Sequence, residues 1–515
     1  MENNNRRVVI TGLGVISPVG NNIADFWNNL TAGYCGIDFI KGFDEYDLPV
    51  KVAGQVKDFD PAANGLDAAN VRRSDIYCQY AMAAAYQAMM DSGLVSGENI
   101  APERLGTYIG SGIGGLQTFV NETKKLLEEG VHRISPLFIP MMISNIAAGN
   151  VAIKFNAQGV CLPVVTACST VTHSAGEAYR AIKYGYADAI ITGGSEASVH
   201  PLAIGGFANS KALSRSEDPK KASIPFNIHR NGFVMAEGAG VLVFESLENA
   251  QKRGAKIYAE VCGYGNTCDA YHYTAPHPDG IPASRAMKQA LSEAGFDPEK
   301  DTLYINAHGT STPLNDKTET AAIKLALGDE TAHKAIISST KSMTGHMLGA
   351  TGAVELIAST LALVNGMTAP VIKENTRRTT LAAYVSVMPS VSDAATLEEV
   401  TDYTTANVTG VVKAPDGGIA IKAEEKGFDG GILTVIMGFD ANGAETGIWV
   451  DASTQTKGIG SNVSTDDFLA QFNGMDGTKN IVMNQDFDAY SGATISSTAL
   501  FAAINDCINC FNELA

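Results

Sequence analysis

The sequence predicts an α/β protein whose larger, N-terminal part contains a mostly parallel, buried sheet, followed by a smaller α+β domain. Short apolar strands alternate with helical patterns from the N-terminus to about residue 366. Reactive side chains follow several of these strands directly, which is where the active groups of open α/β sheets lie. Beyond residue 366 the pattern changes to alternating strands and one C-terminal amphipathic segment.

Length and composition indicate a protein of two or three domains that works among soluble partners. A chain of 515 residues is too long for one ordinary core. A net charge of -18 argues against binding to nucleic acid or to an anionic membrane. The 8 dispersed cysteines are typical of thiols in a reducing compartment. Because we find no signal-peptide pattern and no apolar run near the spanning length of about 18 residues, we expect a cytoplasmic protein without a membrane span.

The first strands enter glycine-rich turns. An apolar strand over residues 8–10 leads into such a turn, and so does the strand that ends in Gly110–Gly115. The second turn contains a literal G-x-G-x-x-G, with Glu128 and Glu129 downstream, a pattern seen in dinucleotide sites. Glycines also occur wherever helices pack tightly on strands. We favour this packing interpretation, and we expect a helix over residues 77–92 between the two strands.

Cys168 is the residue around which the first 366 residues are organised. It follows an apolar strand predicted over residues 164–167 and precedes a helix that runs to about Tyr184. A thiolate in the first turn of a helix faces unpaired N–H groups and the positive end of the helix dipole, so we expect a lowered pKa. A core cysteine that only packs is the alternative, since cysteine is often interior for that reason.

Two histidines follow strands in the second half of this region. His308 comes after a strand predicted at 303–306, and His346 after one predicted at 336–340. A single histidine at such a place is more often a structural hydrogen-bonding residue. Three reactive groups that each lie just past a strand end are harder to attribute to packing, and a cysteine nucleophile needs a base. The sequence therefore predicts an active site built from Cys168 and both histidines.

These motifs resemble the β-ketoacyl-acyl carrier protein synthases, condensing enzymes of the thiolase-fold class, and most of all the elongating type II enzymes of bacterial fatty acid synthesis. The resemblance runs unbroken over roughly residues 6–366. It implies a thiolase-like duplicated α/β/α/β/α fold with halves at 1–254 and 255–366, the second of them incomplete. The motifs that carry it are Thr166–Ser169, Gly193–Glu196, Pro225–Phe226, Gly232–Val234, Glu237–Ala239, Asn306–Thr312 and Ser339–His346.

The resemblance implies an acyltransferase, a 3-oxoacyl-ACP synthase of the KAS II type, in fatty acid or polyketide synthesis. Cys168 would accept an acyl chain from acyl carrier protein, and His308 and His346 would assist decarboxylation of malonyl-carrier protein and stabilise the enolate. The resemblance implies a homodimer, and this reaction would use neither a metal nor a cofactor. The supporting positions implied are Lys341 with Glu355 as its charge partner, Thr310 and Thr312.

The family pattern stops after residue 366. A final strand pair with an Asn-Ser-Phe-Gly-Phe-Gly-Gly loop is expected there and is absent from the sequence. In the family this loop gates the acyl pocket and supplies the second N–H of the oxyanion hole, and loss of one such donor costs about 2.7 to 4 kcal/mol. We therefore expect impaired activity, together with an open sheet edge and exposed apolar surface in the second half.

The remaining residues form a separate region, which we divide into a linker at 367–408 and a domain at 409–515. Strand-like alternation at 418–423 and 432–440 precedes a helix predicted at 497–511. Just before that helix the chain reads Asp488-Ala489-Tyr490-Ser491-Gly492-Ala493-Thr494.

This stretch resembles the flavinylation motif of the FMN-binding domains in the G subunit of Rnf-type and the C subunit of Nqr-type electron-transfer complexes. The resemblance implies FMN held by a phosphoester on Thr494 and placed there by a flavin transferase. An ordinary helix N-cap is the alternative for Thr494. Cys507 and Cys510 are interpreted as helix-face residues, because two ligands cannot close a zinc site.

Three functions remain open at this point. The chain is a cytoplasmic condensing enzyme, a flavoprotein electron carrier, or a chimera in which neither part works. A chimera is considered because the flavin domain lacks the membrane helix that precedes it in its relatives. In addition, the junction near Leu361–Pro370 falls where both families carry similar residues.

Overall fold

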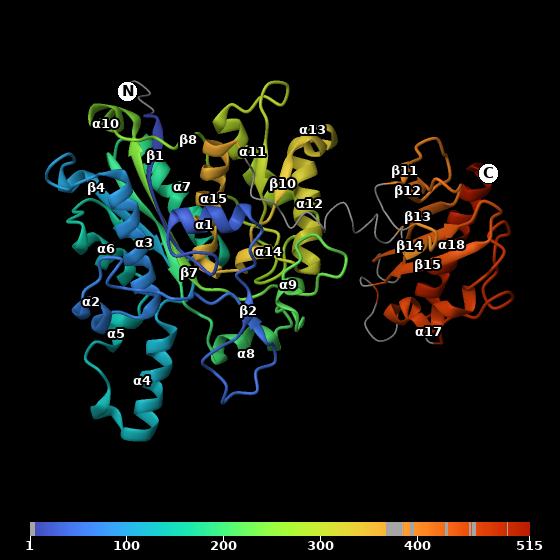
Figure 1. The fold of residues 1–515 in the computed structure, drawn as a ribbon, viewed down its shortest axis with the longest axis horizontal. Coiled ribbons are helices and arrows are strands. Elements are labelled where there is room, and N and C mark those ends of the chain that lie inside the picture. The colour runs from blue at the N-terminus through green and yellow to red at the C-terminus, as the bar shows by residue number, and fades with distance from the viewer. Residues whose placement is uncertain are drawn as a thin grey trace. The chain divides into compact units, whose positions relative to one another are not determined.

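The structure is a computed structural model, which describes residues 6–366, 384, 386–391, 396–427, 431–452, 455, 460–491 and 493–514 (Figure 1). Its internal contacts divide the chain into two units, Met1–Lys373 and Glu374–Ala515. Unit 1 contains the strands and helices that alternate along the sequence, and unit 2 contains an antiparallel sheet with a long helix. The α/β prediction for the N-terminal region is therefore confirmed.

The first half of unit 1 is organised on a six-stranded sheet with the order β5-β4-β6-β7-β1-β8. β4 runs parallel to β5 and β6, whereas β7 is antiparallel to both β6 and β1, and β8 is antiparallel to β1. The sheet is therefore mixed, and the expectation of a mostly parallel sheet is wrong. The central strands are buried along their whole length, as their nearly continuous apolar sequences predict. The strands are β1 Val8–Ile16, β4 Leu105–Gly110, β5 Cys161–Leu162, β6 Ala189–Glu196, β7 Gly238–Ser246 and β8 Ala259–Val261.

Helix α3, Ile76–Ser92, packs on β1, β6 and β7. Its alanines leave room for a close approach, and a Cβ added at Gly14 of β1 would lie 2.0 Å from the carbonyl oxygen of Ala84. Glycine is therefore required there by packing. The helix ends at Gly93, whose φ of 63° is the left-handed geometry that glycine adopts most easily.

Helix α7, Thr170–Lys183, packs on β4 and β6, and α15, Thr351–Asn365, packs on β7 and on α7. These two helices come from different halves of unit 1 and lie at its centre. The other helices of the first half are α1 Ile23–Thr31, α2 Ala68–Arg73, α4 Leu116–Glu129, α5 Phe138–Met142, α6 Ile146–Lys154, α8 Pro201–Asn209, α9 Pro219–Ala222 and α10 Leu247–Lys252. A short antiparallel pair, β2 Asp38–Phe39 and β3 Val52–Ala53, completes this half.

The second half of unit 1 has a much smaller sheet. β9, Tyr304–Asn306, pairs in parallel with β10, Ile336–Ser338, and the two form a sheet of their own. The remaining elements of this half are α11 Ile281–Ala294, α12 Pro313–Leu327, α13 Asp329–Lys334, α14 Lys341–Thr344 and the 3₁₀ turn η4 Leu348–Ala350. Among the described strands, β10 is the only neighbour of β9, so β9 has the open edge expected from the sequence.

One described segment, Leu348–Asn365, is long and apolar enough to cross a membrane, with a mean hydropathy of 1.4 over 18 residues. The sequence-based expectation that no run approaches this length is therefore wrong. Because 61% of the segment is buried and it contains Glu355, its apolar character is explained by packing at the centre of unit 1.

Unit 2 is an antiparallel meander with the order β11-β12-β13-β14-β15, and α18, Thr494–Leu514, packs on β13 and β14. Cys507 and Cys510 are fully buried in the core between helix and sheet. Within the range predicted as a linker, Tyr384, Val387 and Met388 pack with β12 and β13 residues. The other bounds are β11 Glu398–Glu399, β12 Val408–Lys413, β13 Ile419–Lys426, β14 Ile432–Phe439, β15 Glu445–Asp451 and α17 Asp466–Leu469.

Candidate active site

Cys168 lies in the 3₁₀ turn η3, Ala167–Ser169, directly before α7. The strand expected over 164–167 ends earlier, at Leu162, because Pro163 has no N–H to donate to a sheet. Ala167 has a φ of 52°, a left-handed conformation that is uncommon for a residue with a side chain. The turn thus places the thiol directly before the first turn of a 14-residue helix.

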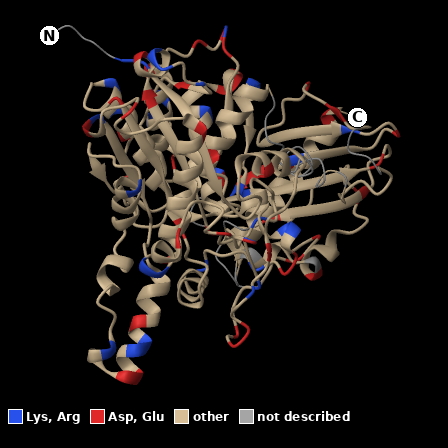
Figure 2. Ribbon diagram, turned by 60° about the vertical axis from the view of Figure 1, so that its left-hand side comes forward, with Lys and Arg blue, Asp and Glu red and all other residues tan. Residues whose placement is uncertain are grey.

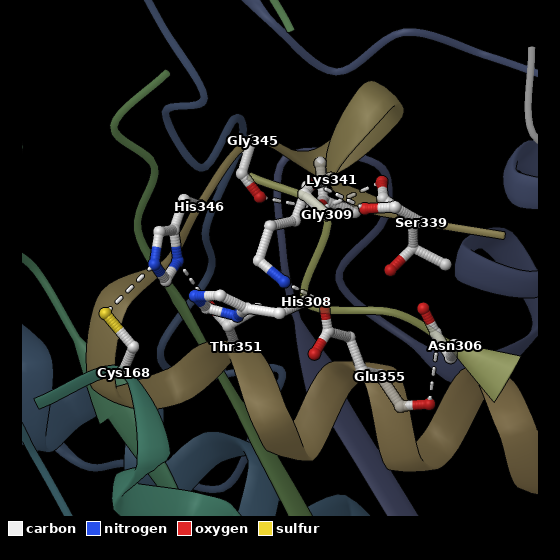
Figure 3. Close-up of polar contacts among 12 residues, drawn as sticks. Cys168, Asn306, His308, Gly309, Ser339, Lys341, Gly345, His346, Thr351 and Glu355 are labelled. Atoms are coloured by element: carbon white, nitrogen blue, oxygen red, sulfur yellow. Dashed lines mark hydrogen bonds and ion pairs between the residues drawn. The ribbon is translucent and has the colours of Figure 1, made fainter. Parts of the chain in front are cut away.

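His346 faces this thiol from the second half of unit 1. Its Nε2 lies 3.1 Å from the Sγ of Cys168, and its Nδ1 lies 2.9 Å from the hydroxyl of Thr351 (Figure 3). The ring also packs edge-on against Phe233, with centroids 5.3 Å apart. Contacts with Thr351, Phe233 and Cys168 thus hold the imidazole in one orientation.

His308 lies beside His346, with its ring nearly perpendicular and the centroids 5.3 Å apart. The loop that carries it is held by Glu319 of α12, whose carboxylate accepts the backbone N–H groups of His308 and Gly309 at 2.6 and 2.7 Å. The three groups predicted from their positions past strand ends therefore meet at one point. Cys168, His308 and His346 each place a nitrogen or sulfur within 4.8 Å of the other two.

Lys341, at the start of α14, is 1% exposed and forms an ion pair with Glu355 of α15 (Figure 3). This is the charge partner that the sequence resemblance predicts. Asn306 at the end of β9 donates its side-chain N–H to the backbone carbonyl of Glu355 at 3.2 Å. Thr310 and Thr312, in the loop after His308, contact each other through hydroxyls 2.8 Å apart.

Burial controls the protonation of the site. It lowers the pKa of His308 to about 3, with the charge of Lys341 acting in the same direction, and it lowers the pKa of His346 well below its usual range. Both imidazoles are therefore neutral near pH 7, so each ring has one N–H to donate. Burial likewise raises the pKa of Glu355 to about 7 despite the neighbouring Lys341.

The expectation of a lowered thiol pKa is not met. Burial raises the pKa of Cys168, and this effect outweighs the opposing influence of Lys341 and of the residue's own backbone N–H. The thiol therefore needs a base, and the Nε2 of His346 is in position to accept its proton.

Glu196, at the end of β6, connects the two halves beside the site. Its buried carboxylate accepts the backbone N–H of Gly112 at 2.9 Å and that of Gly349 at 3.1 Å. A Cβ at Gly349 would lie 2.4 Å from the nitrogen of Gly112, so the two loops can approach this closely only because residue 349 is a glycine. The hydrogen bonds at Glu196 and Glu319 were missed by sequence reasoning, although Glu196 stands in one of the quoted motifs.

The glycine-rich turn after β4 serves packing. Gly110 is in contact with Val164 and Thr170, and a Cβ there would lie 2.3 Å from each. The acidic residues that could have met a ribose lie toward the far end of α4, where both signs of charge occur (Figure 2). Glu129 pairs with Arg133 at 3.0 Å. The arrangement supports the packing interpretation of the G-x-G-x-x-G pattern.

In unit 2 the flavinylation-like motif lies at the N-terminal end of α18. Thr494 is the first residue of this 21-residue helix and is exposed, as are Asp488 and Ser491. Ala493 is buried, and Gly492 lies outside the described residues. The N–H groups at a helix start favour a phosphate, so the residues present fit the phosphoester of FMN.

Comparisons with known proteins agree with both parts. The families described as "Beta-ketoacyl synthase, N-terminal domain" and "Beta-ketoacyl synthase, C-terminal domain" match residues 5–250 and 258–374, and "FMN-binding domain" matches 427–509. The 3-oxoacyl-[acyl-carrier-protein] synthase 2 of Staphylococcus aureus (strain COL) is 50% identical over 72% of this chain and 88% of its own. The synthase of the same name from Synechocystis sp. is 49% identical over 71% and 88%.

Among solved structures, a type II PKS acyl-carrier protein in complex with its ketosynthase bound to the hexaketide aligns with a TM-score of 0.64 at 35% identity. The match covers 71% of this chain and 88% of that one. The thiolase-like fold predicted from the sequence is therefore confirmed for unit 1. The chain belongs to the β-ketoacyl synthase family and carries an FMN-binding domain after the synthase region.

Proposed function

We propose that unit 1 is a β-ketoacyl-ACP synthase that joins an acyl thioester to malonyl-ACP with loss of carbon dioxide. The contact between the Cys168 Sγ and the His346 Nε2, 3.1 Å apart, with His308 beside it, carries this proposal. The 50% identity to 3-oxoacyl-ACP synthases favours fatty acid over polyketide synthesis, since the polyketide ketosynthase is 35% identical. A cytoplasmic reaction is proposed because the thiol must remain reduced.

In the first step His346 accepts the thiol proton of Cys168 on Nε2, which requires that its Nδ1 carry a proton and donate it toward Thr351. The thiolate attacks the acyl thioester of the carrier protein. The carrier thiolate leaves and takes the proton from His346. The product is an acyl group on Cys168 and a free carrier thiol, so atoms and protons balance.

In the second step malonyl-ACP loses carbon dioxide, and the electron pair of the broken carbon–carbon bond forms an enolate. In this step neutral His346 carries its proton on Nε2 and accepts the hydroxyl hydrogen of Thr351 on Nδ1, the opposite tautomer to that of the first step. It and neutral His308 then donate N–H groups to the developing oxyanion, which a buried site stabilises strongly. The enolate carbon attacks the acyl thioester on Cys168. The cysteine leaves as a thiolate and takes one proton from solvent, which the loss of carbon dioxide from a carboxylate requires. The β-ketoacyl chain is two carbons longer.

Lys341 and Glu355 position the histidines in this scheme. Burial lowers the pKa of both imidazoles, and the buried ammonium acts in the same direction, so both rings stay neutral. Thr310 and Thr312 hold the loop after His308 through their hydroxyl contact.

The test is incubation of the full chain with acyl-ACP and malonyl-ACP, with intact mass recording acylation and the ketoacyl product. We expect an acyl adduct on Cys168 and formation of β-ketoacyl-ACP, at a reduced rate because the gating loop is absent. A protein that acquires no acyl group and releases no carbon dioxide would contradict the proposal.

We further propose that unit 1 forms a homodimer through the edge of β5. Leu162 and Val165 are 48% and 50% exposed on this edge, beside the exposed Ile153 of α6. Among the strands that the structure describes, β5 has only β4 as a neighbour. Sedimentation should give twice the mass of the chain, and Leu162→Lys should give the monomer.

For unit 2 we propose covalent FMN on Thr494, attached by a flavin transferase. The match to FMN-binding domains and the exposed Thr494 at the start of α18 support this second function. FMN would add a redox group, and the chain's own contribution is a hydroxyl that forms the phosphoester at a helix N-terminus.

Co-expression with a flavin transferase should increase the intact mass by one FMN minus one water. The increase should be lost in Thr494→Ala and retained in the neighbouring Thr498→Ala, a matched control on the same helix. An unchanged mass in the wild-type chain would contradict the proposal.

A further inference from the structure

The two halves of unit 1 have the same order of elements as far as the second half extends. β1, β4 and β5 of the first half correspond to β8, β9 and β10 of the second. The nucleophile turn and α7 follow β5, and His346 and α15 follow β10 in the same way. The halves differ in what comes next.

In the first half, α7 is followed by the hairpin-like pair β6 and β7, which fills the centre of the sheet in the order β5-β4-β6-β7-β1. In the second half, the described residues of unit 1 end at Gly366, directly after α15. The corresponding order would be β10, β9, two strands and β8. The strands that would join β9 to β8 are the ones for which the described chain of unit 1 has no counterpart.

The free edge of β9 presents backbone groups for such a strand. Leu303 and Ala307 form hydrogen bonds with Ile336 and Ser338 of β10. Because alternate residues of a strand face opposite neighbours, the N–H and C=O groups of Tyr304 and Asn306 point to the other side. None of the described strands pairs with that side of β9.

A cavity of about 270 Å³ lies in this gap. Val261 of β8 and Asn306 of β9 both line it, and Glu355 and Ser359 of α15 form part of its wall. The side-chain Oδ1 of Asn306 is buried there and has no hydrogen-bond partner among the residues described. The cavity is therefore lined by both apolar and polar side chains and holds an unpaired acceptor at the end of β9, the strand whose free edge can pair with added β-structure.

We propose that this gap is a docking site for a β-hairpin supplied by another polypeptide. By analogy with β6 and β7, its first strand lies parallel to β9 and its second is antiparallel to the first and to β8. Both strands are predominantly apolar, as β6 and β7 are, and they become buried at most positions. The hairpin covers Glu355, whose side chain is now 15% exposed, and thereby shields its ion pair with Lys341.

Among the strands that the structure describes, the other sources are already engaged. A second copy of the chain has the same gap, and its own β6 and β7 are hydrogen-bonded inside its sheet. The strands β12 to β15 of unit 2 pair with one another in a complete meander. The occupant is thus a polypeptide whose strands are not part of a finished sheet.

The test uses the full chain and a fluorescently labelled synthetic peptide. The peptide is the segment that follows the counterpart of α15 in the 50% identical synthase of Staphylococcus aureus. We expect saturable binding by anisotropy. Ser359→Arg puts a charged side chain into the gap and should weaken binding at least tenfold, whereas Ser292→Arg, on the exposed face of α11, should bind as the wild type does.

Residue-resolved hydrogen exchange supplies a second measurement that does not depend on activity. Bound peptide should slow exchange at the amides of Tyr304 and Asn306 at least tenfold and leave Ala307, already bonded to Ser338, nearly unchanged. Absence of saturable binding, equal binding by Ser359→Arg, or protection that omits Tyr304 and Asn306 would each overturn the proposal. Thermal melting checks that both variants are folded.

Discussion

The two halves of unit 1 share the same order of elements, but the sheet of the second half is less complete than that of the first. In the first half β4 is buried at all six positions, whereas its counterpart β9 is only partly buried at all three. Yet each half delivers its reactive groups to the same point, Cys168 from one side and His308 and His346 from the other. The comparison teaches that a strand, its following loop and one helix suffice to place a catalytic group, while the rest of the sheet supplies burial.

The first prediction removes the nucleophile, which is the reactive group that the first half contributes to the active site. Cys168→Ala should lower the rate of β-ketoacyl-ACP formation by about 10³-fold or more, because no other group can hold the acyl chain. Cys262→Ala, which removes an exposed thiol of the incomplete half, is the matched control and should retain full activity. Product formation is followed by mass spectrometry. A Cys168→Ala protein with more than a tenth of the wild-type rate would place the nucleophile elsewhere.

The second prediction removes the two histidines, which are the reactive groups that the second half contributes to the active site. His308→Ala and His346→Ala should each reduce malonyl-ACP decarboxylation by about 10² to 10⁴-fold, the usual range for a positioned acid or base. Only His346→Ala should also slow acylation of Cys168, because His346 is the histidine in contact with the sulfur. His333→Ala, an exposed histidine of α13, is the control. Equal acylation defects in both variants would refute this division of roles.

The third prediction compares how much an isoleucine in corresponding strands of the two halves contributes to the free energy of unfolding. Ile109 in β4 is 0% exposed, whereas Ile305 in the counterpart strand β9 is partly exposed. Ile109→Ala should therefore lower the free energy of unfolding by about 2 to 5 kcal/mol. Ile305→Ala should cost about 1 kcal/mol, because the side chain loses less burial.

Urea unfolding is followed by tryptophan fluorescence in a Trp449→Phe background, which leaves Trp27 of unit 1 as the reporter. Equal losses in the two variants would mean that β9 is as well packed as β4, and would contradict the gap between β9 and β8.

The active site could be predicted from the sequence because its three reactive groups obey a local rule. Cys168, His308 and His346 each follow a strand, and parallel strands end at a common edge. The contacts of Glu196 and Glu319 join segments distant along the chain, so no local pattern reveals them. The sign of the Cys168 pKa shift was mispredicted because the helix end is visible in the sequence, whereas the larger effect of burial is not.

The last prediction has the smallest effect and concerns pH. With a pKa of about 3, His308 stays neutral well below pH 7, and the pKa of His346 is lowered as well. Each imidazole is in its active, neutral form above its folded pKa, so acidification from pH 8 to 5.5 should not remove it. Glu355, with a pKa of about 7, does titrate in this window, so the measurement is made in Glu355→Gln.

In that variant the decarboxylation rate should change less than about twofold between pH 8 and 5.5, since no buried imidazole gains a proton there. Circular dichroism at both ends of the range checks that the protein stays folded. Burial also raises the pKa of Glu196 to about 6, so the protonation of each imidazole is followed by NMR in the same samples. A fall in rate that coincides with protonation of His308 or His346 near 6.5, the ordinary pKa of histidine, would mean that solvent reaches the imidazoles through the incomplete half. The gap between β9 and β8 would then affect catalysis as well as stability, and a bound hairpin should move the midpoint back to lower pH.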